Sequence, residues 1–170
     1  MPTFELQFPA SQIEALAGRF PHFDETRLLA VGGAARKRGH YTREEFVQVC
    51  AGKTVRSRSR VASNPEAAVI ETTRRALAAA DEPSRMGALL ELEGVGVPTA
   101  STLLYATFPS EYPILDVRAL ESLGVKPRSQ YPVAFWLEYL QACRELARRN
   151  RVSLRTLDKA LWQHSKERAL

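Results

Sequence analysis

The sequence predicts an all-α protein. Helix-start signals recur along the chain: a Ser, Thr, Asp or Asn side chain stands before a run of helix-forming residues. Apolar residues also repeat at near-helical spacing, as Phe135, Trp136, Leu140 and Cys143 do. Strand-like alternation is weak and confined to residues 1–8. The 170 residues suit one domain with an ordinary core, because 45% of them are hydrophobic.

The first half of the chain contains five helix starts. They lie at Ser11 and Thr42, each with Glu three positions later, at Asp24, at Asn64 followed by Pro65, and at Asp81. Ser11 and Thr42 are expected to form capping boxes, and Asn64 is expected to cap a helix whose first turn holds Pro65. Gly32 and Gly33 are expected to weaken the helix that Asp24 opens.

The second half predicts four more helices, and a tight glycine turn at residues 93–98 precedes the first of them. Asp116 is expected to cap the second, a short helix that stops at Gly124. A loop with two prolines leads to Asp116. The expected helices cover residues 98–108, 116–124, 132–149 and 153 onward.

A formal net charge of +5 favours an anionic partner. The basic residues form three clusters. These are Arg36, Lys37 and Arg38; Lys53, Arg56, Arg58 and Arg60; and Arg144, Arg148, Arg149, Arg151 and Arg155. The third cluster is interpreted as a solvated helix face. The second is the candidate for binding, because it falls in an apparent loop between helices.

Two cysteines and three histidines argue against several kinds of site. Cys50 and Cys143 are too few for a cluster held by four thiolates, and neither lies in a CxxC pair. The histidines lack metal-ligand spacing, so no metal site is expected. No apolar run is long enough to cross a bilayer, and the N-terminus lacks the features of a secretion signal. We therefore expect a soluble cytoplasmic protein.

The most informative pattern lies in residues 89–124. Gly94 and Gly96 bracket Val95 in a very short turn between two helices, where glycine allows positive φ and close backbone approach. Free N–H groups of this turn and of the next helix would converge on one place. That place is suited to a phosphate and needs no charged side chain. A plain turn between two helices is the alternative interpretation.

This stretch, LEGVGVPTA at residues 92–100, resembles the hairpin of the helix-hairpin-helix superfamily of base-excision DNA glycosylases. The family pattern continues with a proline-containing loop and an aspartate, which matches Pro109, Pro113 and Asp116 here. In the endonuclease III branch the catalytic aspartate follows a catalytic lysine by eighteen residues, and that lysine position is Pro98 here. The segment over residues 45–165 is similar to a bacterial subgroup that lacks the iron–sulfur cluster.

The resemblance implies a two-lobed helical glycosylase fold over residues 1–170. Residues 42–124 would form a helical-barrel lobe with the hairpin at 92–99, and residues 1–41 plus 125–170 would form the second lobe. The implied protein is a monomer of the bacterial cytoplasm, associated with the nucleoid and with double-stranded DNA. It would need no cofactor, although main-chain carbonyls of the hairpin can hold a sodium or potassium ion.

The implied activity is hydrolytic release of a damaged or mismatched base, with Asp116 as the catalytic carboxylate. Such a carboxylate stabilises positive charge on the sugar and activates water. Without a lysine at Pro98, no strand-cleaving lyase step is expected. The DNA-binding candidates are Gly94, Val95, Gly96, Val97, Thr99, Lys53, Arg56, Arg58 and Arg60, and the base-pocket candidates are Tyr112, Tyr105 and Trp136.

Each of these roles has an alternative. Asp116 is also a preferred N-cap, which alone would explain it. Lys53 suits a phosphate contact, but a desolvated lysine near the lesion is also a nucleophile. Trp136 and other aromatic residues at helical spacing are typical of a core. For the whole chain, the alternatives are a non-catalytic helix-hairpin-helix DNA-binding protein and a helical protein-interaction domain.

Overall fold

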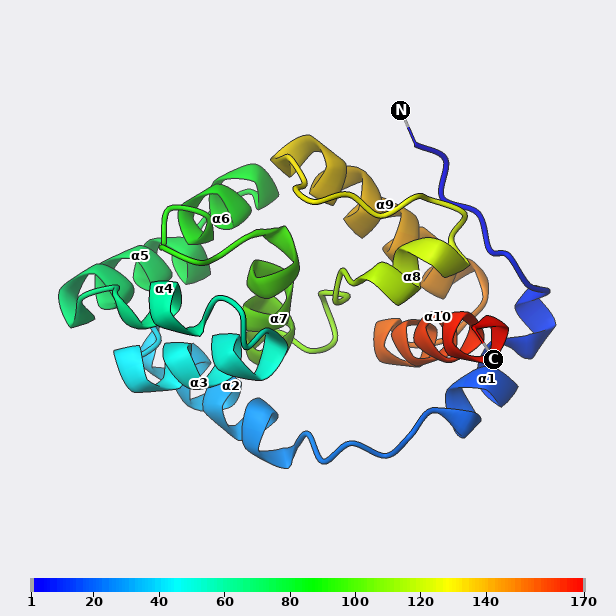
Figure 1. The fold of residues 1–170 in the computed structure, drawn as a ribbon, viewed down its shortest axis with the longest axis horizontal. Helices are drawn as coiled ribbons and strands as arrows, with labels where there is room; N and C mark the ends of the chain where they lie inside the picture. Colours follow the sequence, from blue (N-terminus) through cyan, green and yellow to red (C-terminus); the bar gives the residue numbers. More distant parts are fainter. Residues whose placement is uncertain (1, 170) are drawn as a thin grey trace.

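The structure, a computed structural model, describes residues 2–169, and within this range it contains helices and no β-strand (Figure 1). The all-α prediction is therefore confirmed. The helices are η1 (Ala10–Gln12), α1 (Ile13–Arg19), α2 (Thr26–Arg38), α3 (Arg43–Lys53), α4 (Arg58–Ala62), α5 (Glu66–Ala78), α6 (Glu82–Leu89), α7 (Val97–Thr107), α8 (Val117–Ser122), α9 (Val133–Arg149) and α10 (Leu154–Arg168). None of the helices in this range is long and apolar enough to cross a membrane.

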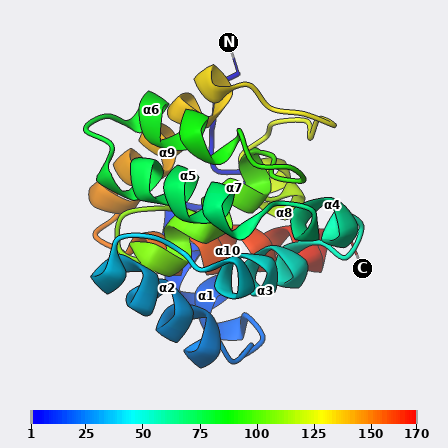
Figure 2. The ribbon, with the colours of Figure 1, turned by 90° about the vertical axis from the view of Figure 1, so that its left-hand side faces the viewer.

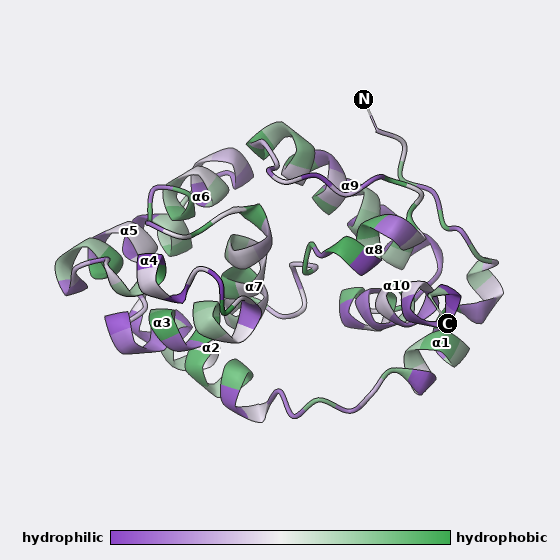
Figure 3. Ribbon diagram, viewed as in Figure 1, coloured by the Kyte–Doolittle hydropathy of each residue, from purple (hydrophilic) through white to green (hydrophobic). Residues whose placement is uncertain are grey.

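The helices pack as two groups. In the first, α7 contacts α2 and α3, α5 contacts α6, and α3 contacts α4 beside it (Figure 2). In the second, α10 contacts α1, α8 and α9. The contact between α6 and α9 joins the groups at the top of Figure 1. Most helices carry both hydrophobic and hydrophilic residues (Figure 3), whereas α7 is buried along nearly its whole length.

The border between the groups differs from the predicted lobes, which placed α2 with the C-terminal helices and α8 with the hairpin. Instead α2 packs against α7, and α8 packs against α10. Gly32 explains the first difference, because a Cβ on it would overlap the backbone carbonyl of Ala106. The glycine therefore permits two helix backbones to approach closely. This contact joins residues far apart in the sequence, so no local pattern predicts it.

Four predicted helix starts are confirmed by side-chain caps. The side chains of Thr42, Asp81, Asp116 and Ser153 each accept a hydrogen bond from the backbone N–H three residues later. At Thr42 the full capping box forms, because the Glu45 side chain also accepts from the Thr42 N–H at 2.9 Å. Local sequence chemistry is sufficient to place these helix starts.

The other predicted starts differ from the structure. Ser11 makes no capping bond, and α1 begins at Ile13. Asp24 accepts from the Thr26 N–H at 2.9 Å but lies two residues before α2. Asn64 does not cap α5, because its side chain is bonded to the backbone of Val61 and of the glycine turn. For Asn64, a tertiary contact replaces the local cap.

Candidate active site

The glycine turn between α6 and α7 has one glycine that its conformation requires. Gly94 has φ +78°, in the left-handed region, and a Cβ on it would lie 2.9 Å from the backbone nitrogen of Val61. Gly96 has φ −100° and meets only Pro98, at 3.8 Å. The expectation of positive φ therefore holds for Gly94 and is wrong for Gly96. Gly96 instead leaves the backbone at the start of α7 uncovered by a side chain.

The basic segment is fixed beside this turn. Asn64 donates its amide to the Glu93 carbonyl at 3.0 Å and accepts from the Glu93 N–H at 2.9 Å, which holds the end of α4 against the turn. The prediction of a loop over residues 53–60 is partly wrong, because α4 begins at Arg58. Arg56, Arg58 and Arg60 are all exposed. They stand in solvent next to the hairpin.

A surface hollow lies between the turn and the basic segment. It is bordered by Ser57, Arg60, residues 90–98 and residues 129–131. Gly94, Val95, Gly96 and Val97, all DNA-binding candidates, border it. Thr99, another candidate, does not: it is buried in the first turn of α7. Arg60 is the one basic side chain of the hollow among the residues described, and it pairs with Glu93, which also borders the hollow, at 3.6 Å.

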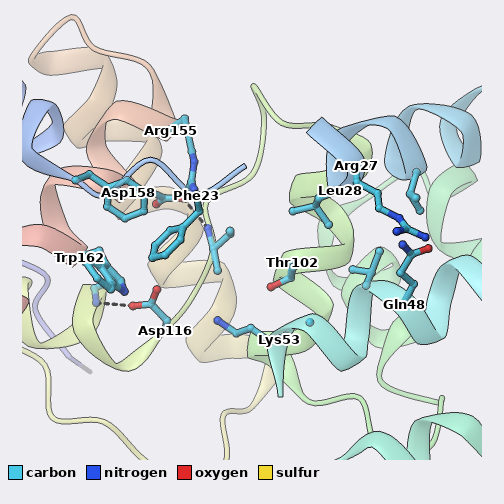
Figure 4. Close-up of a pocket in the computed structure, with 16 residues that line it drawn as sticks. Phe23, Arg27, Leu28, Gln48, Lys53, Thr102, Asp116, Arg155, Asp158 and Trp162 are labelled. Atoms are coloured by element: carbon cyan, nitrogen blue, oxygen red, sulfur yellow. Dashed lines mark hydrogen bonds and ion pairs between the residues drawn. The ribbon is translucent and has the colours of Figure 1, made fainter. Parts of the chain in front are cut away.

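A cavity of about 480 Å³, open on one side, lies between the two groups of helices (Figure 4). This volume is typical of small-ligand sites. The lining residues include Phe20, Phe23, Leu28, Val49, Lys53, Thr102, Ile114, Asp116, Arg155, Asp158 and Trp162. Helix α7 connects the two sites: Pro98 borders the hollow and Thr102 lines the cavity, about 6 Å further along the helix axis.

Asp116 lies in the wall of this cavity as the N-cap of α8. Its Oδ1 accepts from the Ala119 N–H at 2.7 Å, which fixes the carboxylate (Figure 4). Its Oδ2 has no hydrogen-bond partner among residues 2–169. The capping bond therefore leaves the second oxygen of Asp116 without a partner in the described chain, so capping is compatible with a role in the cavity.

Asp158, on α10, is a second carboxyl group in the same cavity. It is 5% exposed; Oδ2 accepts from the Ile114 N–H at 2.9 Å, and Oδ1 has no partner among the described residues. Burial raises the pKa of Asp158 to about 8, against the lowering effect of the Ile114 bond and of Arg155. Sequence reasoning missed it. The available signal was an acidic residue on the apolar face of α10, between Leu157 and Leu161.

Asp158→Asn is expected to stabilise the protein near pH 8 by about 1–3 kcal/mol. Because the folded-state pKa exceeds the unfolded value, the unfolded state loses its proton first as pH rises, and wild-type stability falls between about pH 4 and pH 8. Asparagine has no such loss and still offers Ile114 an acceptor. Urea unfolding across this pH range measures the difference, which should grow with pH. A difference that does not change with pH would contradict the assignment.

Lys53, the last residue of α3, extends its amine toward Asp116 from the opposite side of the cavity (Figure 4). It is half-buried and has no hydrogen bond or ion pair within 4.0 Å in the described part of the chain. Burial lowers the pKa of the Lys53 ammonium, and the negative charge of Asp116 opposes this effect. The structure thus places Lys53 with the carboxyl groups and not in the hairpin hollow.

The three predicted base-pocket residues do not line this cavity, and that prediction is corrected. Trp136 is fully buried, with Tyr112 stacked on it at 6.4 Å between ring centroids. The Tyr112 hydroxyl donates to Glu82 at 2.8 Å and accepts from Arg85 at 2.7 Å. Tyr105 is buried and donates to Glu25 at 2.7 Å. Polar partners hold both tyrosines away from the cavity.

Other aromatic residues form one wall of the cavity. Phe20 and Trp162 meet edge to face, with ring centroids 5.1 Å apart, and Phe23 packs against both (Figure 4). Phe23 is 60% exposed, which is unusual for so large an apolar side chain. Phe20 and Phe23 come from the segment before α2 and Trp162 from α10, so their meeting depends on the tertiary fold.

Compared with known protein families, curated proteins and solved structures, the chain matches none of them. The functional argument therefore depends on the residues and geometry of the hollow and the cavity. The two sites hold a glycine turn with the exposed Arg60 beside it, two carboxyl groups, one lysine amine and an aromatic wall.

Proposed function

We propose that this protein is a DNA N-glycosylase with the two-lobed helix-hairpin-helix fold, which releases a damaged or mismatched base from double-stranded DNA. The observation that carries the proposal is the cavity with Asp116 in its wall. This cavity lies close to the hairpin, because Thr102 in its lining is one helical turn along α7 from Pro98. An enzyme of this class must take the target nucleotide out of the base stack and enclose it. A module that only binds DNA needs no such cavity.

The hairpin hollow is the proposed phosphate site. Gly96 and Val97 border this hollow, the start of α7 has no side-chain cap, and Gly96 leaves room for close approach of an anion to the backbone. The exposed Arg56 and Arg58 flank Ser57 at the border of the hollow and add positive charge, whereas Arg60 is paired with Glu93. The segment from Lys53 to Ser57 links the cavity to the hollow, so one strand of DNA would contact both.

The hollow also fits a monovalent cation, as the resemblance implies. Leu90 and Val95 border it, and within residues 2–169 their main-chain carbonyls accept no hydrogen bond, as is also true of Glu91 and Gly94. Carbonyls of this set would hold the ion, which would bridge to a phosphate. The chemistry proposed below does not depend on this ion.

Asp116 is the proposed catalytic residue. Breaking an N-glycosidic bond builds positive charge on the sugar, and a fixed carboxylate stabilises that charge and orients the attacking water. The capping bond to Ala119 fixes the group before substrate arrives, and Oδ2 is available to the sugar or the water. With Pro98 at the family's lysine position, base release itself proceeds through water.

Asp158 and the aromatic wall are proposed to act on the base. With its pKa raised to about 8 by burial, Asp158 is mostly protonated at neutral pH and has a proton to give to a leaving base. Phe23, which is 60% exposed, offers a ring for stacking, which contributes roughly 1–3 kcal/mol for each base. Trp162 supports Phe23 from behind, because Arg118 and Lys166 each lie 5.2 Å from the Trp162 ring centroid. Asp116 would therefore act on the sugar and Asp158 on the base.

Replacing Arg56 and Arg58 by glutamine is expected to weaken binding to any duplex sequence. If each arginine neutralises one phosphate, the slope of log affinity against log salt should become about 2 units less steep. Fluorescence anisotropy over a salt series measures this slope. The matched control is Arg148→Gln with Arg149→Gln on α9, outside the hollow and the cavity, and it should keep the wild-type slope. Equal slopes for the two double variants would contradict the proposed DNA surface.

Base release from a panel of duplexes tests the proposed function. Each duplex carries one damaged or mismatched base, and mass spectrometry detects free base after incubation with the wild-type protein. Release from at least one duplex supports the glycosylase. Salt-sensitive binding to the panel without release from any member would favour the non-catalytic module. No retardation of any duplex at low salt would favour a protein-interaction domain.

A further inference from the structure

Lys53 is the chemically active group that base release does not use. Its amine lies in the cavity with Asp116 in front of it (Figure 4), and no ion pair or hydrogen bond holds it in the described chain. A lysine that served packing or stability would be expected to pair with one of these carboxylates. Here the amine stays available to a bound molecule.

The surroundings of Lys53 favour an amine that reacts. Burial lowers the pKa of its ammonium, which increases the fraction of neutral, nucleophilic amine. The exposed arginines nearby carry guanidinium groups, which do not form imines with an aldehyde. Among residues 2–169, Lys53 is the only lysine that lines the cavity.

We propose that Lys53 attacks the aldehyde of an abasic deoxyribose in this cavity and gives the protein a strand-cleaving lyase activity. The proposal rests on the proposed function only in assigning the cavity to a DNA sugar. In the bifunctional branches of the superfamily the amine comes from the hairpin, at the position of Pro98. Here it comes from α3, on another wall, which would revise the expectation that lyase activity is absent.

The reaction balances without any cofactor. The Lys53 Nζ lone pair attacks C1′ of the ring-opened sugar, and uptake of one proton from solvent with loss of one water gives a protonated imine. Asp116 then takes the proton from C2′, the C3′–O bond breaks, and a C2′=C3′ double bond forms. The phosphate leaves on the downstream strand, and that proton passes to solvent. One water hydrolyses the imine, which returns the amine and leaves an unsaturated aldehyde on the upstream strand.

A duplex with a preformed abasic site tests this step without requiring base release. Borohydride reduces the imine to a stable amine, so the wild-type protein should become covalently attached to the DNA, with peptide mapping locating the adduct at Lys53. Without borohydride, the strand should be cut. Lys53→Arg keeps the charge but forms no imine, so adduct and cleavage should fall by about 100-fold or more while binding persists. Lys159→Arg is the matched control and should behave as wild type.

The inference is overturned if the wild-type protein gives no adduct and no cleavage, whether or not it binds the abasic duplex. It is also overturned if the adduct maps to another lysine, or if Lys53→Arg is trapped as well as wild type. Base release from the damaged-base panel without trapping would leave the proposed function standing and this inference refuted. Trapping at Lys53 without base release from any duplex would support an abasic-site lyase and refute the proposed glycosylase.

Discussion

Asp116→Asn is expected to lower single-turnover base release by about 100- to 1,000-fold, the range typical for loss of one electrostatic contact to the transition state. Asparagine has nearly the same shape, and its oxygen still accepts the bond from the Ala119 N–H. The helix cap therefore survives while the negative charge is lost. The rate of base release, measured with excess protein on the best duplex of the panel, reports the effect of that charge.

The same variant should bind DNA as well as wild type or more tightly, because it removes a negative charge near the phosphates. Asp81→Asn is the matched control. Asp81 caps α6 by accepting from the Ser84 N–H at 2.8 Å, and it lies outside the cavity. It should leave base release unchanged. If Asp116→Asn releases base at the wild-type rate, Asp116 is a helix cap only, and the mechanism proposed for it is wrong.

Gly32→Ala is expected to destabilise the protein by about 3 kcal/mol or more, at the upper end for overpacked sites. The added Cβ would overlap the backbone carbonyl of Ala106, and a backbone atom has no alternative rotamer. Helices α2 and α7 would have to separate, which would also widen the cavity between Leu28 and Thr102. Urea unfolding followed by circular dichroism measures the loss.

Gly33→Ala, one residue further along α2, is the matched control. A Cβ there meets nothing within 4 Å, so alanine should stabilise the helix by up to about 1 kcal/mol through its higher helix propensity. The two substitutions are chemically identical and should have opposite signs. Two stabilising substitutions would show that α2 and α7 do not pack as closely as described here.

Much of the fold could be predicted because its helix starts depend on local chemistry. Thr42, Asp81, Asp116 and Ser153 cap helices by bonds to residues only three positions away. The prediction failed where a distant partner intervened. Asn64 has the ideal residue type for a cap, but its amide bonds to Glu93, and the energy of two partly buried hydrogen bonds outweighs one local cap.

The residues of the candidate site also divide into those that the sequence predicts and those that depend on the tertiary fold. Asp116 and Lys53 were singled out from the sequence, and the structure brings them to one cavity. The prediction of which aromatic residues line the cavity was wrong, because the tertiary fold decides which rings reach it. Tyr112 bonds to Glu82 and Arg85 instead, while Phe23 reaches the cavity from a loop. Asp158 was predictable in principle, since an acidic residue on an apolar helix face needs an explanation.

The position of the sugar in a crystal structure of Asp116→Asn bound to a duplex with one abasic-site analogue tests the central claim most directly. We predict that this sugar lies outside the duplex and inside the cavity, with C1′ about 3.5 Å from the side chain of residue 116. We also predict a phosphate of the same strand at the hairpin hollow. A complex in which the analogue stays within the helix, or in which the DNA lies on another face and the cavity is empty, would contradict the account.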